Sequence, residues 1–518
     1  MDTNKKKSLS RREFLKGTAV SSVAIAGSTL LAGCKPAAET ASNLPETWDK
    51  ETDVVVVGYG GAGAAAAIAA REAGVEVLIL EKMMVAGGSS AISGGVYYAG
   101  GTSVQKEFGI EDSADKMYEH YLNTGKGFND PKLARLAADY SAANVEKLIE
   151  LGATFPDPPT IAGAEYHAGS EPIARVHAIN FEGKTGGAAY FGALDSGVKK
   201  LGAEIMLETK AEELIVDADG QVVGVVADQS GTKMNIKARK GVILSTGGFT
   251  RNEQMLKDYS QQGYYCQPLG APGLDGDGLK MAFALGAAAS NITEVLAIPG
   301  LTLPGSKAAT YAFWTFVPTI PAILINNRGE RFTDEFGFYD WKATALLKQP
   351  DKYSYSLFDA KGRDAGAGMF VMGWTPDLEQ EVADGIVVKA DTLEELAELI
   401  EVPADRLAAT IAKWNEDVAA GVDSDYGRTG GLDTIDTAPF YAFKTFAAMF
   451  DNMGGLKINE NGQVIDVKDS VISRLYAAGN VAGGVLGEDY PGSGSAYNAG
   501  VTFGTISGKH AAALENWG

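Results

Sequence analysis

The feature that most constrains this 518-residue chain is a strand, glycine turn, helix and second strand between Asp53 and Glu81. Four consecutive valines, 54–57, predict a buried strand that runs into a Gly-x-Gly-x-x-Gly turn and an alanine-rich helix. Such glycines permit a tight turn, a close approach of pyrophosphate to the backbone, and close packing of helix on strand. Amides at the helix N-terminus then hold the phosphates. We therefore predict dinucleotide binding at Gly58, Gly60, Gly61, Ala62 and Gly63.

Glu81 completes this pattern, because it stands at the end of the second apolar strand, 75–80, and 18 residues beyond Gly63. An acidic side chain at that place accepts hydrogen bonds from a ribose diol. A chance glycine turn would not be followed by helix, strand and acid in this order. The sequence therefore predicts a Rossmann-like α/β domain with Glu81 in its nucleotide site.

The first 34 residues predict a processing segment, which we leave out of the fold. Residues 10–16, SRREFLK, are typical of a twin-arginine (Tat) export signal, and residues 31–34 resemble a lipoprotein box in which Cys34 becomes acylated. We therefore expect export by Tat, a periplasmic or other extracytoplasmic location, and attachment to the membrane only through a lipid at Cys34. Residues 35–50 are polar and predict a linker.

The charge of the chain argues against nucleic acid as a partner. The whole chain carries 45 Lys and Arg against 66 Asp and Glu, and removal of residues 1–33 takes away six basic and two acidic side chains, which leaves 39 − 64 = −25. So acidic a surface repels nucleic acid. The cysteines are Cys34 and Cys266 alone, so we predict no disulfide framework and no metal or cluster site.

The rest of the chain predicts two further parts. A glycine-rich loop at 87–95 and a buried strand with its own glycine turn at 241–248 continue the nucleotide-binding domain, and an aromatic-rich insert follows. A helix is expected near residues 502–514. We expect the first part of the nucleotide-binding domain at 51–297, a capping and substrate domain at 298–450, and the second part of the nucleotide-binding domain at 451–518.

Several motifs together resemble one family. The glycine turn, the 87–95 loop, RGERFTDE at 328–335, NMGG at 452–455 and AAGN at 477–480 are similar to those of the fumarate reductase and 3-ketosteroid dehydrogenase flavoprotein superfamily, over residues 50–518. The resemblance implies an α/β, Rossmann-like FAD-binding domain of the two-dinucleotide-binding type with an inserted α+β capping domain. It also implies an enzyme that adds or removes hydrogen across a C–C bond next to a carbonyl.

The resemblance extends the set of residues expected to bind FAD. Members with covalent flavin have a histidine in the second glycine loop, where this chain has Gly88, so we expect non-covalent FAD. Beyond the glycine turn and Glu81, the expected FAD-binding residues are Lys82, Gly87, Gly88, Ser89, Ser90, Ser93, Gly94, Gly95, Thr246, Gly247, Gly248, Asp277, Gly479, Asn480, Ser495 and Ala496.

The resemblance also distinguishes two branches of the superfamily. Fumarate reductases hold two carboxylates with histidines and arginines, and the matching positions here are Ile298, Phe450 or Asp451, Tyr339 and Tyr490. A dianionic substrate would lose several charge-assisted hydrogen bonds of roughly 1.5–3 kcal/mol each. A dicarboxylate is therefore disfavoured as the substrate.

The same positions look like the ketosteroid dehydrogenase branch, which has a tyrosine four residues after the motif glutamate and a Tyr-Pro-Gly-x-Gly segment. By this resemblance Tyr339 moves the proton, and the Tyr490 hydroxyl and Gly494 amide bind a ketone oxygen. Donors fixed at that oxygen stabilise the enolate charge that hydride transfer builds there. A further tyrosine assists in that branch, and the sequence leaves Tyr98 and Tyr166 open for this part.

We therefore expect an FAD-dependent oxidoreductase that adds or removes hydrogen across a C=C bond conjugated to a ketone on a hydrophobic, steroid-like or other, molecule. FAD N5 carries the hydride, and the same groups serve both directions. One alternative is a reductase of an unsaturated acid of the fumarate, urocanate or acrylate type, used as an extracytoplasmic electron acceptor. Another is a flavin-bearing lipoprotein that binds ligands or relays electrons. An exported enzyme would exchange electrons with a quinone, cytochrome or flavoprotein partner.

Overall fold

The computed structural model describes residues 42–161, 169–302, 309–311, 321–367 and 374–518. All of them belong to one compact unit, Thr40–Gly518. The predicted export segment with Cys34, residues 35–41 of the predicted linker, and Tyr166 lie outside the described residues. Within the described ranges, no helix combines the length and apolar character that a bilayer crossing requires.

The nucleotide-binding part is built on a sheet of eight described strands. Along the sheet the order is β20-β21-β10-β1-β2-β7, and β9 joins β8 to β10. Neighbours from β21 to β7 pair in parallel, as expected for a Rossmann-like sheet. The strands are β1 (Lys50–Val57), β2 (Val77–Leu80), β7 (Glu204–Met206), β8 (Thr209–Val216), β9 (Val222–Gln229), β10 (Thr232–Leu244), β20 (Gln463–Ile465) and β21 (Val471–Ala477).

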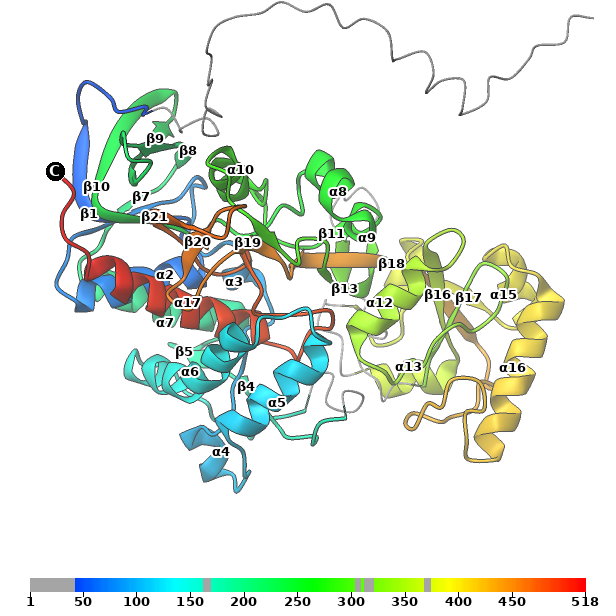
Figure 1. Cartoon of the computed structure of the whole chain (residues 1–518). Helices are drawn as coiled ribbons and strands as arrows, with labels where there is room; N and C mark the ends of the chain where they lie inside the picture. The colour runs from blue at the N-terminus through cyan, green and yellow to red at the C-terminus, as the bar shows by residue number, and fades with distance from the viewer. Residues whose placement is uncertain (1–41, 162–168, 303–308, 312–320, 368–373) are drawn as a thin grey trace, which may run out of the picture. The chain divides into compact units, whose positions relative to one another are not determined.

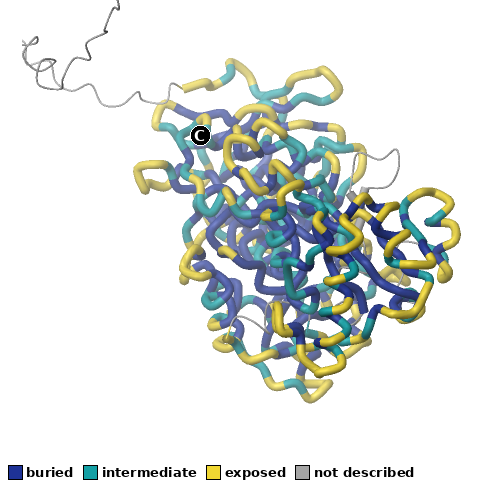
Figure 2. Tube along the Cα trace, turned by 90° about the vertical axis from the view of Figure 1, so that its right-hand side faces the viewer, coloured by how far each residue is buried: buried dark blue, intermediate teal, exposed yellow. Residues whose placement is uncertain are grey.

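Both faces of this sheet are covered, which explains the unbroken run of valines in β1. Alternate residues of a strand point to opposite faces. Val54 and Val56 pack with helices α2 (Gly61–Glu72) and α7 (Gly186–Lys200), whereas Val55 and Val57 pack in a second cluster that includes residues of β8 and β9. A strand buried on both faces is apolar throughout. Val54, Val55, Val56 and Val57 are all buried, and Figure 2 shows dark blue, buried segments gathered in the interior of the molecule.

The C-terminal helix α17 (Ser495–Ala512) runs beside α2 (Figure 1). A Cβ added to Gly504 would lie 2.4 Å from the Ala62 carbonyl oxygen, so the absence of a side chain permits this close packing. The predicted start near residue 502 was wrong. The helix begins at Ser495, after Gly494 at φ 99°, so its first two turns precede the predicted start.

The inserted part contains a second sheet with seven described strands. Their order is β14-β13-β18-β16-β15, and β11 and β17 also pair with β18. These strands are β11 (Gln267–Pro268), β13 (Val295–Thr302), β14 (Ala309–Tyr311), β15 (Ile323–Ile325), β16 (Tyr353–Phe358), β17 (Val388–Ala390) and β18 (Phe440–Asn452). The expected domain boundaries at 297/298 and 450/451 fall inside β13 and β18, which pair antiparallel, so the chain passes between the two parts through continuous strands.

The remaining elements surround these sheets. The helices are α3 (Gly88–Ile92), α4 (Ser103–Glu107), α5 (Ala114–Gly125), α6 (Pro131–Glu150), α8 (Glu253–Tyr259), α9 (Gln261–Tyr264), α10 (Asp277–Ala284), α12 (Tyr339–Leu347), α13 (Ala360–Gly366), α14 (Glu379–Ala383), α15 (Leu393–Leu399) and α16 (Ala404–Ala419). The short strands are β3 (Val96–Tyr98), β4 (Val176–Ala178), β5 (Asn180–Phe181), β6 (Lys184–Thr185), β12 (Ala289–Ser290), β19 (Gly455–Lys457) and β22 (Ala482–Gly483).

The RGERFTDE segment forms a buried ionic network in the cap. Arg331 Nη2 lies 2.7 Å from Glu335 Oε2, and its Nη1 lies 2.9 Å from Asp423 Oδ1. Glu335 also accepts the Leu324 N–H, so it holds the segment to β15. This network fixes the turn that leads into α12. The expected α/β architecture with a Rossmann-like domain and an α+β cap is confirmed.

Candidate active site

A cavity with about 1040 Å³ of empty space, partly open to solvent, lies at the carboxyl ends of β1, β2, β10 and β21. Ligands of parallel α/β sheets bind at this edge. We call it the cofactor cavity. Of the residues predicted to bind FAD, those that line it are Gly58, Gly60, Gly61, Ala62, Glu81, Lys82, Gly88, Ser89, Ser90, Thr246, Gly247, Asp277, Gly479, Asn480 and Ala496.

The glycine turn brings backbone close to backbone at the floor of the cavity. Gly58 has φ 101°, and a Cβ there would lie 2.4 Å from the Ser245 carbonyl oxygen. The Gly61 N–H donates to Ser90 Oγ at 3.1 Å. The following first-turn amides of α2 have no partner within the helix. These donors, together with the helix dipole, suit a pyrophosphate.

Glu81 lies at the cavity wall with its carboxylate held by two backbone amides. Its Oε2 accepts the Tyr59 N–H at 2.9 Å, and its Oε1 accepts the Met83 N–H at 2.8 Å. A carboxylate oxygen has a second lone pair, so each oxygen can still accept a ribose hydroxyl. The expected ribose acceptor is thus in place and held in one orientation.

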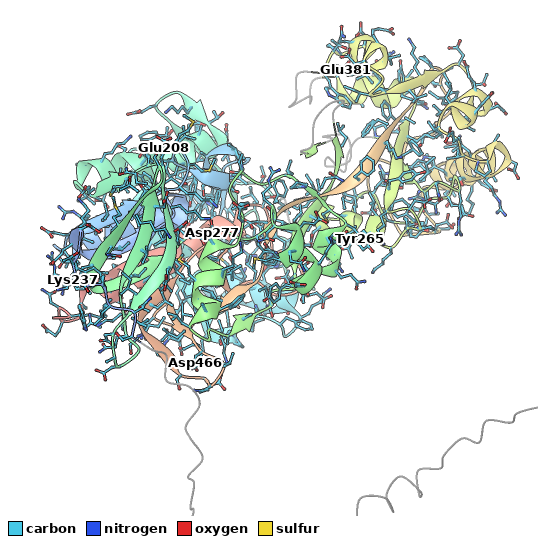
Figure 3. All side chains as sticks on the ribbon, turned by 90° about the horizontal axis from the view of Figure 1, so that it is seen from above. Glu208, Lys237, Tyr265, Asp277, Glu381 and Asp466 are labelled. Atoms are coloured by element: carbon cyan, nitrogen blue, oxygen red, sulfur yellow. The ribbon has the colours of Figure 1, made fainter. Side chains whose placement is uncertain are left out.

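Lys82 and Asp277 meet at one end of the cavity. Lys82 Nζ lies 2.6 Å from Asp277 Oδ2 and 2.9 Å from Asp275 Oδ2, and Lys210 Nζ lies 3.4 Å from Asp277 Oδ1. Asp277 is the first residue of α10 and is labelled in Figure 3. The ion pairs join segments far apart in sequence, and the spacing of charged residues along the chain gave no signal of Lys210.

The other residues predicted to bind FAD do not line the cavity. Gly63 and Gly95 serve backbone packing: an added Cβ would lie 2.1 Å from the Gly58 oxygen and 1.8 Å from the Gly186 carbonyl carbon, respectively. These two glycines therefore permit the close backbone packing next to the cavity wall. The full set outside the lining is Gly63, Gly87, Ser93, Gly94, Gly95, Gly248 and Ser495.

Two tyrosines that the sequence analysis did not single out line the cavity. The rings of Tyr190 and Tyr497 stack with centroids 3.9 Å apart and planes 6° apart, and Tyr497 Oη donates to the Ser90 carbonyl at 2.9 Å. Tyr497 directly follows the predicted Ser495 and Ala496, which was a usable signal. Tyr190 lies in the middle of α7 and gave none. The amides at the α2 N-terminus can donate to phosphate, Glu81 can accept from a ribose, and the glycine turn lets a pyrophosphate approach the backbone. Together these groups fit an FAD molecule.

A second group of predicted residues meets where the cap contacts the C-terminal segment. Tyr339, the first residue of α12, is buried, and its hydroxyl lies 3.4 Å from Ser493 Oγ. The Phe338 ring lies 4.0 Å from the Tyr339 ring and stacks on Tyr490 at 6.5 Å and 8°. We call Phe338, Tyr339, Tyr490, Ser493 and Gly494 the tyrosine site. The structure thus brings the three predicted catalytic residues together.

The Tyr490 hydroxyl is held at the N-terminus of α17. It accepts the Ala496 N–H at 3.0 Å, and the Gly494 amide lies nearby. That Gly494 and Tyr490 bind one ketone oxygen together stays a prediction. Burial raises the pKa of Tyr490, which keeps the hydroxyl protonated at neutral pH. Within the described part of the chain, its proton has no acceptor, so it is the group available to donate.

A layer of buried polar side chains backs the tyrosine site. Burial raises the pKa of Tyr121 to about 12, and the Tyr121 hydroxyl accepts Asn498 Nδ2 at 3.4 Å. His120 Nε2 lies 2.8 Å from the Pro491 carbonyl oxygen, and burial lowers its pKa to about 4, so a neutral imidazole donates this bond. Tyr98 packs on Gly492, where an added Cβ would lie 2.4 Å from the ring. Nothing in the sequence singled out His120 or Tyr121.

The charges around the tyrosine site are acidic or already paired. Arg175 is buried and pairs with Asp112 at 2.8 and 2.9 Å, and Lys126 lies 2.8 Å from Asp489. Burial raises the pKa of Asp340 to about 7, and it does the same for Asp451 in the wall of the cofactor cavity. Ile298 is buried in β13. Arg175 Nη1 has no hydrogen-bond partner, but the charge of the guanidinium is already balanced by Asp112. Among the residues that the structure describes here, Arg175 and Lys126 thus each already face a carboxylate.

Comparisons with known proteins agree with a flavin site. The model of the FAD binding domain family matches residues 53–496. A probable fumarate reductase of Shewanella frigidimarina is 32% identical and covers 89% of this chain and 75% of that protein. A urocanate reductase of Eggerthella lenta is 32% identical over 96% of this chain and 80% of that protein. The solved 3-ketosteroid-Δ4-(5α)-dehydrogenase of Rhodococcus jostii RHA1 has a TM-score of 0.75 and 28% identity, covering 90% of this chain and 98% of that one.

Proposed function

Because the chain belongs to the fumarate reductase and 3-ketosteroid dehydrogenase flavoprotein superfamily and is an FAD-dependent oxidoreductase acting on CH–CH bonds, we propose that it reduces a C=C bond conjugated to a neutral carbonyl. The reductive direction is supported by the names of the two curated relatives, both of which are reductases. The carbonyl class is supported by residues of this chain.

The names of the relatives support a different substrate class more directly. Fumarate and urocanate are unsaturated carboxylic acids, and the relatives that carry these names match most of the chain. A reductase of an unsaturated acid is therefore the second candidate. The names describe other chains, however, and the choice between the candidates depends on which groups meet the carbonyl here.

The observation that carries the proposal is the tyrosine site itself. A carboxylate brought there would face phenols and buried carboxyl groups, with Arg175 and Lys126 already paired. Each missing charge-assisted hydrogen bond costs roughly 1.5–3 kcal/mol. A ketone needs only a neutral donor, and the Tyr490 hydroxyl is one, held at its oxygen by the Ala496 amide.

Tyr339 has the chemistry of a proton donor in this direction. A phenol with a pKa near 10 in water is protonated at neutral pH, so a reductase can use a tyrosine as its acid directly. The Tyr339 hydroxyl is within reach of Ser493 Oγ, on the segment that carries Tyr490. In the proposed reaction Tyr490 donates to the carbonyl oxygen, and Tyr339 delivers the proton to the carbon next to the carbonyl.

FAD would occupy the cofactor cavity and supply the hydride to the other carbon of the double bond. Glu81, the α2 N-terminus and Ser90 hold its nucleotide part in this proposal. Non-covalent attachment is supported by Gly88 and by the lack of histidine and cysteine in residues 87–95. The cavity residues bind and orient the cofactor, whereas the tyrosine site handles the proton and the carbonyl.

Export and electron supply complete the proposal. The twin-arginine and lipoprotein motifs support an extracytoplasmic enzyme anchored through Cys34. Such an enzyme would draw electrons from a quinone, cytochrome or flavoprotein. Membrane and soluble fractions probed for the wild type and for Cys34→Ser would test the anchor, since the proposal predicts that only the variant becomes soluble.

The substrate class is tested by reoxidation of the flavin. The purified holoenzyme would be reduced chemically under anaerobic conditions and mixed with a 3-keto-4-ene steroid, a 1,4-diene-3-one steroid, fumarate, urocanate or acrylate, while absorbance at 450 nm is followed. The proposal predicts rapid reoxidation by one or both enones and slow reoxidation by the acids. Rapid reoxidation by an acid alone would establish the second candidate instead.

A further inference from the structure

Asp340 lies where the cap helix meets the segment that carries Tyr490. It is the second residue of α12 and is buried. Its Oδ1 accepts the Ala297 N–H of β13 at 3.1 Å, and its carboxyl lies near enough to the Tyr490 backbone N–H for that N–H to lower its pKa. One carboxyl group thus binds β13 from α12 and lies beside the Tyr490 segment.

The surroundings of this carboxyl are unfavourable for a charge. The titratable groups that face it include Glu294, Asp489, the Cys266 thiol and the Tyr490 hydroxyl, and it forms no ion pair with a cation of the described residues. Burial raises the pKa of Asp340 to about 7, although the N–H groups of Ala297 and Tyr490 oppose that rise. A buried carboxyl without a cationic partner is a poor source of stability. Stability therefore does not account for an aspartate at this position.

The location of the carboxyl gives another account. Tyr339 directly precedes Asp340 in the chain, and the Tyr490 backbone N–H lies beside the Asp340 carboxyl. Resting on the proposed function, we propose that Asp340 is a positioning residue that sets the distance between the Tyr339 and Tyr490 hydroxyls. The ring of Phe338 packs on both tyrosines and keeps the remaining space filled.

The reaction requires a precise distance between the Tyr339 and Tyr490 hydroxyls, so a contact that sets this distance affects the rate. Proton transfer and carbonyl binding must act on adjacent atoms of one substrate, and a misplacement of about 1 Å can cost about 100-fold in rate. Tyr339 and Tyr490 belong to different parts of the chain, so their relative position depends on contacts between those parts. Asp340 forms such a contact directly behind both side chains.

The contact between the Asp340 carboxyl and the Tyr490 amide can be tested without any substrate. Hydrogen–deuterium exchange of the holoenzyme, read at the Tyr490 amide, would compare the wild type with Asp340→Ala and Asp340→Asn. Asp359→Ala is a matched control, because the buried Asp359 carboxylate accepts the N–H groups of Gly362, Asp436 and Thr437 elsewhere in the cap. We expect at least tenfold faster exchange at Tyr490 in Asp340→Ala and no change in the control. Unchanged exchange in Asp340→Ala would overturn the proposal.

The consequence for catalysis is tested by kinetics on the same proteins. At a saturating acceptor, flavin reoxidation by Asp340→Ala should be about 10- to 100-fold slower than by the wild type, with the FAD dissociation constant unchanged. The wild-type rate should rise as pH passes about 7, because an ionised carboxylate accepts both amides more strongly, and Asp340→Asn should lack that rise. If Asp340→Ala does not fold, the exchange at Tyr490 and the flavin reoxidation would both be measured on the near-isosteric Asp340→Asn.

The two possible failures are distinguishable. If the reduced wild type is reoxidised by none of the acceptors, the proposed function fails, and the exchange at Tyr490 still decides whether Asp340 ties the segments. If the wild type reacts and Asp340→Ala and Asp359→Ala lose rate equally, the positioning role is overturned while the proposed function stands.

Discussion

The cofactor cavity and the tyrosine site are built from different kinds of groups, mainly backbone in the first and side chains in the second. The cavity is formed mainly by backbone and glycine at the ends of neighbouring strands, and Glu81 is held there by the amides of Tyr59, in the glycine turn, and Met83, just after it in the chain. The tyrosine site is formed by side chains from α12 and the segment before α17, which meet only in the folded protein. The first region is therefore specified by short motifs, and the second by long-range packing.

The difference explains why one region can be common to a superfamily while the other changes. Residues 53–496 match a general FAD-binding model, whereas the positions matching the carboxylate-binding residues of fumarate reductases are Ile298, Phe450 or Asp451, Tyr339 and Tyr490. Side chains at the tyrosine site can be replaced without changing the glycine turn or the parallel sheet. Substitutions in the two regions should accordingly affect different measurements.

The largest expected effect is in the cavity, for Gly63→Ala. The new Cβ would lie 2.1 Å from the Gly58 oxygen and 2.6 Å from Ser245 Oγ, so α2 must move away from β1. We expect a protein that retains almost no flavin, measured as the ratio of absorbance at 450 and 280 nm. Gly94→Ala is the matched control, because nothing lies within 4 Å of its added Cβ, and it should keep its flavin. Equal flavin content in both variants would refute the packing argument.

Tyr339→Phe should have the next largest effect, and only on turnover. Removal of a general acid typically costs about 10²- to 10⁴-fold in rate, so reoxidation of reduced flavin by an enone should slow by that factor while flavin content stays constant. Tyr441→Phe serves as control, because Tyr441 is a buried tyrosine of the cap whose hydroxyl accepts Arg363 Nη1 at 3.0 Å. A normal rate for Tyr339→Phe would remove it as the proton donor.

Asp451 should make stability depend on pH. Burial raises the pKa of Asp451 to about 7, above the 3.8 of an unperturbed aspartate, so the folded state holds a proton that the unfolded state releases between these values. The contribution of Asp451 to stability is therefore greatest below about pH 4 and falls as pH rises to about 7, by up to about 4 kcal/mol. Thermal unfolding of the wild type and Asp451→Asn at pH 5 and 7.5 would measure this. A fall of equal size in both proteins would contradict the assignment to Asp451.

Glu81→Gln should have the smallest effect, confined to cofactor affinity. The glutamine retains one acceptor but turns an NH₂ group toward one of the two backbone amides, so a charge-assisted bond is lost. We expect FAD to bind about 10- to 100-fold more weakly, at roughly 1.5–3 kcal/mol, as measured by quenching of flavin fluorescence. The exposed Glu208, labelled in Figure 3, gives the control Glu208→Gln, for which the affinity should not change. A loss of turnover in Glu81→Gln saturated with FAD would contradict the claim that this residue affects cofactor affinity alone.

The contrast between the regions also explains what could be predicted from the sequence. The run of valines, the glycines and Glu81 follow one another within 29 residues, and local rules relate them to a strand, a turn and a helix. Tyr190 was missed because its contact with Tyr497 joins α7 to α17, and no short pattern links them. The early start of α17 was missed because GSGSAYNAG contains three glycines, whereas packing against α2 favours helix there.

The tyrosine site was only partly predictable for the same reason. Tyr339 and Tyr490 were identified through motifs resembling those of a known branch, but their surroundings were not. Asp340 stands next to Tyr339 in the sequence. The contact of the Asp340 carboxyl with the Tyr490 amide, however, depends on the approach of two distant segments. His120 supports Pro491 from α5 in the same manner. Burial and pairing of these polar groups arise from tertiary structure and leave no periodic signal.

The most direct test of the central claim compares two acceptors that differ only in the carbonyl group. Reduced wild-type holoenzyme would be mixed anaerobically with 4-phenyl-3-buten-2-one, a neutral enone, or with trans-cinnamate, its carboxylate counterpart, and flavin reoxidation would be followed at 450 nm. The tyrosine site predicts a second-order rate constant at least 100-fold larger for the ketone. An equal or larger constant for cinnamate would contradict it and favour a carboxylate-binding site.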